Sequence, residues 1–139
     1  MDSGLGCLLW KDEKFYQNVV QRVDKSSLLR MVKKINSIKK RDDFLKLRSI
    51  GKKITSKFFI IYFKKLSYKN INLGITVSKK HGNAVNRNYM RRVIKAVFIK
   101  NLNQIPQKLE IEIIPKINKA KLRFKEIETD CLGIFNSLK

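Results

Sequence analysis

The chain has 139 residues, with 32 Lys or Arg against 11 Asp or Glu, so its formal net charge is +21. This length suits a single folded domain, and a hydrophobic content of 43% excludes a disordered basic tail. One His and two distant cysteines, Cys7 and Cys131, are too few ligands for a structural zinc site. No apolar run approaches the roughly 20 residues that cross a bilayer, and isolated thiols are typical of reduced cysteines. We therefore expect a cytoplasmic protein that binds no membrane.

The first 36 residues differ in charge from the rest, because they carry a net +3 whereas residues 37–139 carry +18. We divide the chain accordingly into an N-terminal extension, 1–36, and one domain, 37–139. Apolar residues at four-residue steps predict an amphipathic helix from Asp12 to Val23, and Ser26 is suited to cap a second short one. Two interpretations of the extension stay open: an added, partly helical or poorly ordered segment, or upstream sequence included by the choice of start codon.

The domain is predicted to begin with a helix from Asp42 to Ile50, with acids in its first turn and a glycine stop. Residues 52–65 are rich in β-branched and aromatic side chains and predict a strand, bent near Thr55. Strict alternation from Ile71 to Val77 predicts a second strand with one buried face. We expect these two strands to pair as a hairpin.

A long helix is predicted from Asn83, a suitable N-cap, to about Asn101. A further strand from Leu109 to Ile114 would end at Pro115, and a last helix would span residues 122–138. With the bent strand counted as two, the element order is αβββαβα. This order predicts an α/β (α+β) sandwich, in which helices pack on a small mixed sheet.

Residues 44–109 contain 16 Lys or Arg and no Asp or Glu. On the predicted long helix, Arg87, Arg91 and Lys95 lie four residues apart and share one stripe, where like charges repel. Lys79 and Lys80 precede the helix N-terminus, whose dipole attracts anions. The alternative is a solvated basic face, but the absence of acids and the use of Arg favour binding to nucleic acid phosphate.

The sequence from Lys79 to Arg92, KKHGNAVNRNYMRR, resembles the signature of the bacterial ribonuclease P protein subunit, and the resemblance covers about residues 37–139. It implies a fold similar to the ribosomal protein S5 domain 2-like fold. It also implies that this chain is an RNA-binding protein that pairs with the catalytic RNA subunit of ribonuclease P, one protein per RNA. Ribonuclease P removes the 5′ leader from precursor tRNA. Mg²⁺ and the chemistry would then belong to the RNA, with no catalytic side chain, cofactor or metal ligand in this chain.

Transferred onto this sequence, the resemblance implies two sets of RNA-contacting residues. The set for the RNA subunit is Lys79, Lys80, Asn83, Arg87, Asn88, Arg91 and Arg92. The set for a cleft that takes the leader is Phe44, Lys57, Lys64, Arg87, Arg91 and Lys95. Phe44 keeps two interpretations, as an aromatic that stacks on a leader base or as a core residue.

Three positions depart from the family pattern. Tyr89 stands where an arginine follows the Arg-Asn pair, Arg48 replaces a second aromatic of the first helix, and Pro115 replaces an arginine that ends the third strand. We interpret His81 as a turn residue and not a proton shuttle, since no acid lies near it in sequence.

Two other functional classes are alternatives to this family. A ribosome-associated structural protein would share the basic sandwich but show no dependence on the leader. A protein-only nuclease needs clustered carboxylates for its metal, whereas the acids after residue 36 lie away from the basic motif.

Overall fold

The computed structural model describes residues 35–117 and 124–138. The helices predicted at 12–23 and after Ser26, and Cys7, lie outside these residues. Within the described ranges, no helix is long and apolar enough to cross a membrane.

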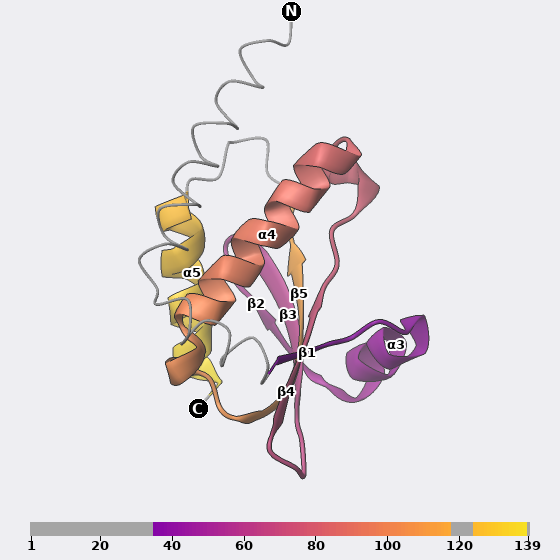
Figure 1. Cartoon of the computed structure of the whole chain (residues 1–139), viewed down its shortest axis with the longest axis vertical. Helices are drawn as coiled ribbons and strands as arrows, with labels where there is room; N and C mark the ends of the chain where they lie inside the picture. Colours follow the sequence, from indigo (N-terminus) through magenta and orange to yellow (C-terminus); the bar gives the residue numbers. More distant parts are fainter. Residues whose placement is uncertain (1–34, 118–123, 139) are drawn as a thin grey trace, which may run out of the picture.

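A five-stranded mixed sheet forms the centre of the molecule (Figure 1). Its spatial order is β1-β4-β5-β3-β2, with β4 parallel to both β1 and β5, and β3 antiparallel to both β5 and β2. The strands are β1 (Ile35–Ser37), β2 (Lys52–Thr55), β3 (Phe59–Lys65), β4 (Asn70–Ile75) and β5 (Lys108–Pro115). The predicted fold class is confirmed, and the order αβββαβα holds once β1 is added in front.

The predicted pairing of the strands needs one correction. β3 and β4 do not form a hairpin, because β5 lies between them: Ile111 is in register with Phe63 on one side and Leu73 on the other. β5 is buried on both faces along much of its length, as a central strand must be. The hairpin instead joins β2 to β3, within the segment predicted as one bent strand.

Strand β1 had no sequence prediction. It pairs in parallel with β4 over three residues, and the predicted domain boundary at residue 36 falls inside it. The sheet therefore begins slightly before the segment assigned to the domain from charge alone.

Two helices cover one face of the sheet and a third covers the other (Figure 1). The helices are α3 (Arg41–Ile50), α4 (Ala84–Lys100) and α5 (Phe124–Ser137). The main core lies between the sheet and the pair α4 and α5, where the Phe98 and Phe135 rings meet edge to face at 5.7 Å between centroids. Helix α3 lies on the opposite face and contacts β3 and β5. This leaves the edge formed by β1 and β4 between α3 and α4.

Candidate nucleic-acid interface

The start of α4 is built by a short series of turn residues after β4. Lys79–His81 form a single turn of 3-10 helix, and Gly82 follows with φ of 107°, a left-handed conformation that favours glycine. Asn83 caps α4 as predicted, because its side-chain oxygen accepts a hydrogen bond from the Asn86 backbone N–H at 2.9 Å. His81 lies in the turn, with its Nε2 3.0 Å from the Pro115 carbonyl oxygen. These contacts hold Lys79 and Lys80 beside the helix N-terminus.

The cations of the motif differ in exposure. Lys79, Lys80, Arg91 and Arg92 are exposed, whereas Arg87 is half-buried and its Nε has no hydrogen-bond partner among the described residues. Arg91 donates from Nη1 to the Asn88 side-chain oxygen at 3.1 Å, which orients its guanidinium along the helix surface.

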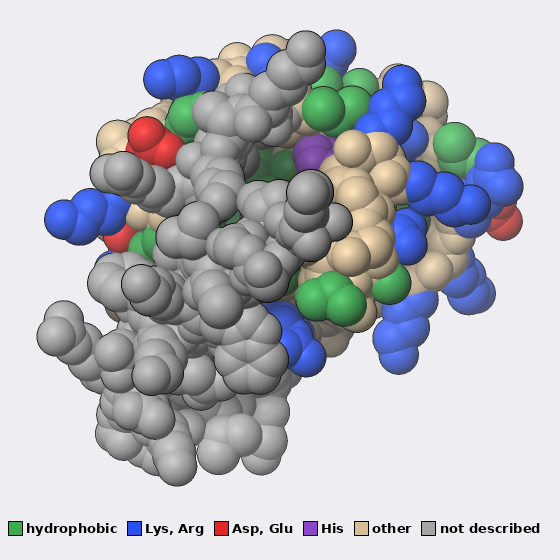
Figure 2. All heavy atoms as spheres, turned by 90° about the horizontal axis from the view of Figure 1, so that it is seen from above, with side chains coloured by type: hydrophobic (Ala, Val, Ile, Leu, Met, Phe, Trp, Pro, Cys, Tyr) green, Lys and Arg blue, Asp and Glu red, His purple; other side chains and the backbone are tan. Residues whose placement is uncertain are grey.

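The charge of this end is not neutralised by the acids that the structure describes. The salt bridges between described residues join Arg48 to Glu112 and Lys100 to Glu128 and leave out Lys79, Lys80 and Lys95. In the view onto this end of the molecule, Lys and Arg side chains gather to one side of His81 and acidic ones are few (Figure 2). The arrangement suits a polyanion.

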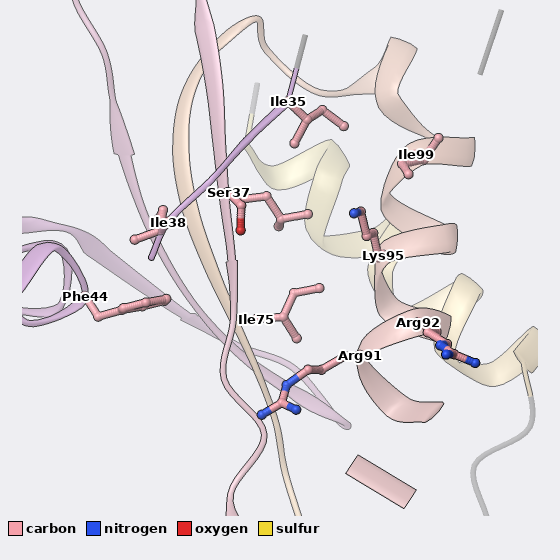
Figure 3. Close-up of a pocket in the computed structure, with 10 residues that line it drawn as sticks. Ile35, Ser37, Ile38, Phe44, Ile75, Arg91, Arg92, Lys95 and Ile99 are labelled. Atoms are coloured by element: carbon pink, nitrogen blue, oxygen red, sulfur yellow. The ribbon is translucent and has the colours of Figure 1, made fainter. Parts of the chain in front are cut away.

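A groove of about 260 Å³ runs between α3 and α4 along the β1 and β4 edge. Helix α4 contributes Arg91, Arg92 and Lys95, and α3 contributes Phe44 from the other side (Figure 3). The apolar part comes from the strands, the residue after β1 and the end of α4: Ile35, Ile38, Leu73, Ile75 and Ile99. We call this the basic groove. Cations along one wall and an aromatic on the other are the elements with which proteins bind a single strand of nucleic acid.

Phe44 reaches the groove because β4 has a glycine beneath it. A Cβ atom on Gly74 would lie 2.4 Å from Cε1 of the Phe44 ring, closer than side chains tolerate. Phe44 is half-buried and lines the groove as well. Phe44 therefore packs on the strand with one edge while its ring borders the groove.

The structure brings together only part of the predicted leader-contacting set. Phe44, Arg91 and Lys95 line the basic groove, and Arg92 joins them, whereas Arg87, Lys57 and Lys64 do not. Lys57 lies in the connection between β2 and β3, with its Nζ 5.0 Å from the Phe58 ring centroid, in a separate hollow beside α5. Lys64 lies near the end of β3, in register with Glu110. Ile35 of β1 and Ile38 after it were not predicted as groove residues, because a strand of three residues shows no readable alternation.

The three departures from the family pattern have structural roles. Tyr89 is half-buried and packs against the core cluster. Pro115 ends β5, and its carbonyl oxygen meets His81. Arg48 binds the buried carboxylate of Glu112, and this pair raises the pKa of the guanidinium. Tyr89 is thus a packing residue at the position of a missing cation.

Comparison with known proteins identifies a family for this sequence. The family model described as Ribonuclease P matches residues 32–139. The ribonuclease P protein component of Bacillus pumilus is 31% identical over 105 residues, which cover 75% of this chain and 88% of that protein. That of Listeria welshimeri is 36% identical over 104 residues, covering 74% and 87%.

Solved structures agree in fold. The ribonuclease P protein of Thermotoga maritima superposes with a TM-score of 0.69 at 26% identity, covering 75% of this chain and 98% of that one. The protein from Staphylococcus aureus gives a TM-score of 0.65 at 28% identity, covering 74% and 97%. The family model, the relatives and the shared fold together show that this chain belongs to the bacterial ribonuclease P protein family.

Proposed function

We propose that this chain is the accessory protein subunit of ribonuclease P and assists the removal of the 5′ leader from precursor tRNA. One protein would bind one catalytic RNA in the cytoplasm. The observation that carries the proposal is the basic groove, which lies directly beside the family motif. Arg91 belongs to both surfaces, so a strand in the groove would continue onto RNA bound at the start of α4.

In this proposal the two surfaces have separate partners. The start of α4, with Lys79, Lys80 and Asn83, contacts phosphates of the RNA subunit, because exposed cations and the positive end of the helix dipole converge there. The groove takes the leader of precursor tRNA, with Phe44 as a stacking surface and Lys95 near the backbone. Neutralising these phosphates lowers the concentration of Mg²⁺ that the complex needs.

The chemistry is assigned to the RNA and its Mg²⁺ ions. Support comes from three of the described acids, which are engaged in structural contacts. Glu112 is held by Arg48, and Glu128 pairs with Lys100 at 2.6 Å. Asp130 accepts hydrogen bonds from the Ser56 hydroxyl at 2.5 Å and the Phe58 backbone N–H at 3.0 Å. Each of these three carboxylates serves the fold, and none of them lines the groove.

The test is reconstitution of the full chain with a bacterial ribonuclease P RNA and a precursor tRNA. We expect the protein to speed cleavage at low Mg²⁺ and to raise affinity for precursor tRNA over mature tRNA. A ribosome-associated structural protein, the second candidate, would treat the two tRNAs alike. Equal affinity for both would therefore overturn the proposed leader contact.

The double variant Arg91→Ala, Lys95→Ala examines the groove itself. It should reduce the preference for precursor tRNA and lower the slope of log affinity against log salt by roughly 0.7 for each lost phosphate contact. Lys125→Ala, an exposed position on α5, is the matched control. Circular dichroism should show the same fold in all three proteins. An unchanged salt slope in the double variant would move the leader away from the groove.

A further inference from the structure

The peptide group at the end of β5 has one half that β3 satisfies and one half that points the other way. Its N–H belongs to Lys116 and donates to the Phe58 carbonyl oxygen, on the β3 side, at 2.8 Å. The N–H and C=O of one peptide point in opposite directions across a strand, so the Pro115 carbonyl points toward the β4 side. Pro115 is buried, and a buried carbonyl needs a hydrogen-bond donor.

β4 ends too early to supply that donor from its backbone. The ladder between β4 and β5 finishes where the Thr76 N–H donates to the Ile113 carbonyl oxygen at 3.1 Å. A ladder continued by two residues would bring the Ser78 N–H to the Pro115 carbonyl, but a turn begins at Ser78. The donor is instead the imidazole of His81, whose Nε2 lies 3.0 Å from the Pro115 carbonyl oxygen. Because a carbonyl oxygen only accepts hydrogen bonds, Nε2 carries the proton.

The turn that carries the first two lysines of the family motif is tied to β5 by this bond. Lys79 and Lys80 are exposed and lie between Ser78 and His81. The backbone bond from the His81 N–H to the Ser78 carbonyl oxygen, at 3.1 Å, joins residues of the turn to one another. The chain enters the turn from the buried Val77 and leaves it toward α4. The imidazole bond therefore fixes the two lysines relative to the sheet, beside the Lys and Arg side chains gathered in Figure 2.

The acceptor of the imidazole is held in place by further contacts. Lys116, the residue after Pro115, donates from Nζ to the Ser56 carbonyl oxygen at 2.6 Å. The Ser56 hydroxyl and the Phe58 N–H both donate to the Asp130 carboxylate on α5. The end of β5 is thus fastened to the connection between β2 and β3 and to α5. A side chain that bonds to this end is attached to a rigid part of the fold.

We propose that His81 is a positioning residue for the RNA subunit. By donating from Nε2 to the Pro115 carbonyl, it would hold Lys79 and Lys80 where their ammonium groups meet phosphates at the start of α4. His81 acts through the two lysines and needs no contact with RNA of its own. The inference rests on the proposed function, in which these lysines bind the RNA subunit, and it adds the group that places them.

The first experiment compares His81→Phe with His81→Gln in the full chain. Phenylalanine keeps a ring but has no donor, whereas the glutamine amide nitrogen can donate from nearly the position of Nε2. Both replacements are uncharged, so the comparison between them involves no change of charge. Affinity for a ribonuclease P RNA transcript is measured at several salt concentrations, and circular dichroism checks that each protein is folded.

We expect His81→Gln to bind like the wild type and His81→Phe to bind about five-fold more weakly, as for the loss of one hydrogen bond. His81→Phe should also lower the slope of log affinity against log salt by roughly 0.7 for each phosphate contact that a lysine loses. A replacement that damages only the fold would not be rescued by glutamine in this way. Equal affinity of His81→Phe and His81→Gln would overturn the inference.

The second experiment repeats the comparison in a protein that also carries Lys79→Gln and Lys80→Gln. If His81 acts through the lysines, His81→Phe and His81→Gln should bind the transcript equally in this background, because the anchored groups are gone. An undiminished difference between them would show that His81 acts by another route, and the inference would fall.

The lysine variant on its own separates this inference from the proposed function. Weaker RNA binding by Lys79→Gln, Lys80→Gln, together with no effect of His81→Phe, would leave the proposed contact at the start of α4 standing and remove only the role of His81. Wild-type affinity of Lys79→Gln, Lys80→Gln would instead remove that contact from the proposed function, and the role of His81 with it.

Discussion

Arg48 on α3 donates two hydrogen bonds to the carboxylate of Glu112 on β5, from Nε at 2.8 Å and from Nη2 at 2.6 Å. Glu112 is fully buried, and Thr76 donates a third hydrogen bond to the same carboxylate at 2.5 Å. The pair fixes α3 against the sheet one turn after Phe44. An arginine at the position of a family aromatic therefore positions the helix that carries the other aromatic.

Removal of Arg48 should destabilise the protein more than removal of both partners. Arg48→Met leaves the buried Glu112 carboxylate with Thr76 as its remaining side-chain partner. We expect the free energy of unfolding to fall by about 2 to 4 kcal/mol. This is near the lower end for a broken buried ion pair, because the guanidinium is partly solvated. Urea denaturation of the wild type, of Arg48→Met, of Glu112→Gln and of the double variant that combines them measures this loss.

The double variant Arg48→Met, Glu112→Gln is the control for that prediction. It has no buried unpaired charge and should recover much of the lost stability, giving a coupling energy above about 1 kcal/mol in the double-mutant cycle. Additive losses would show that the pair contributes nothing beyond two separate side chains.

Two glycines should respond in opposite ways to alanine. Gly74→Ala places a methyl group 2.4 Å from the Phe44 ring, so we expect destabilisation of about 1 to 3 kcal/mol and a weaker preference for precursor tRNA as the ring leaves the groove. Gly133 on α5 has nothing within 4 Å of an added Cβ, and Gly133→Ala should stabilise by about 0.5 to 1 kcal/mol. Thermal unfolding and tRNA binding of both variants check this. A Gly74→Ala protein with full stability would mean that Phe44 moves freely.

Local features of the fold could be predicted because their signals are local. The Asn83 cap and the acids and glycine around α3 each act within one turn of chain, and both helices begin within one residue of the prediction. Strand neighbours could not be predicted in this way. The insertion of β5 between β3 and β4 depends on contacts between residues 38 to 56 positions apart, which alternation does not encode.

The same division applies to the candidate site. Arg91 and Lys95, which helical periodicity puts on one face of α4, both line the groove, whereas Arg87 of the same predicted stripe does not. Lys57 and Lys64 were assigned to the cleft on composition and resemblance, but their surroundings depend on a turn and on sheet order. Lys57 consequently faces a hollow beside α5, away from the groove. Periodicity within one helix thus predicts which residues are neighbours, but which of them border a groove depends on the sheet and on α3 and needs coordinates.

Asn83 allows the stability of α4 to be separated from its binding of RNA. Asn83→Ala removes the hydrogen bond to the Asn86 backbone and should cost about 1 kcal/mol of stability. Asn83→Asp keeps the cap and suits the helix dipole, but it puts a carboxylate beside Lys79 and Lys80. We expect Asn83→Asp to unfold like the wild type and to bind the RNA subunit more weakly than Asn83→Ala does. Equal RNA affinity of Asn83→Asp and wild type would place the RNA subunit elsewhere.

Cys131 should be an inert thiol in the folded protein and a reporter of unfolding. It is buried in the core, and burial, with smaller contributions from the charges of Asp130 and Glu128, raises the pKa of its thiol from 9.0 to about 12. In a Cys7→Ser background, iodoacetamide at pH 8 should label Cys131 slowly in the native protein and rapidly in denaturant. Fast labelling of the native protein would show that α5 opens readily.

The same raised pKa predicts how stability depends on pH. The unfolded chain loses the thiol proton near pH 9 and the folded chain only near pH 12, so the protonated thiol supports folding fully below pH 9 and this support is lost as the pH rises. The wild type should therefore lose about 1 to 2 kcal/mol relative to Cys131→Ala between pH 9 and pH 10.5. Comparison of the two proteins cancels the titration of Lys and Tyr, which they share. A difference that stays constant over this range would mean that the thiol ionises as easily in the folded core as in the unfolded chain.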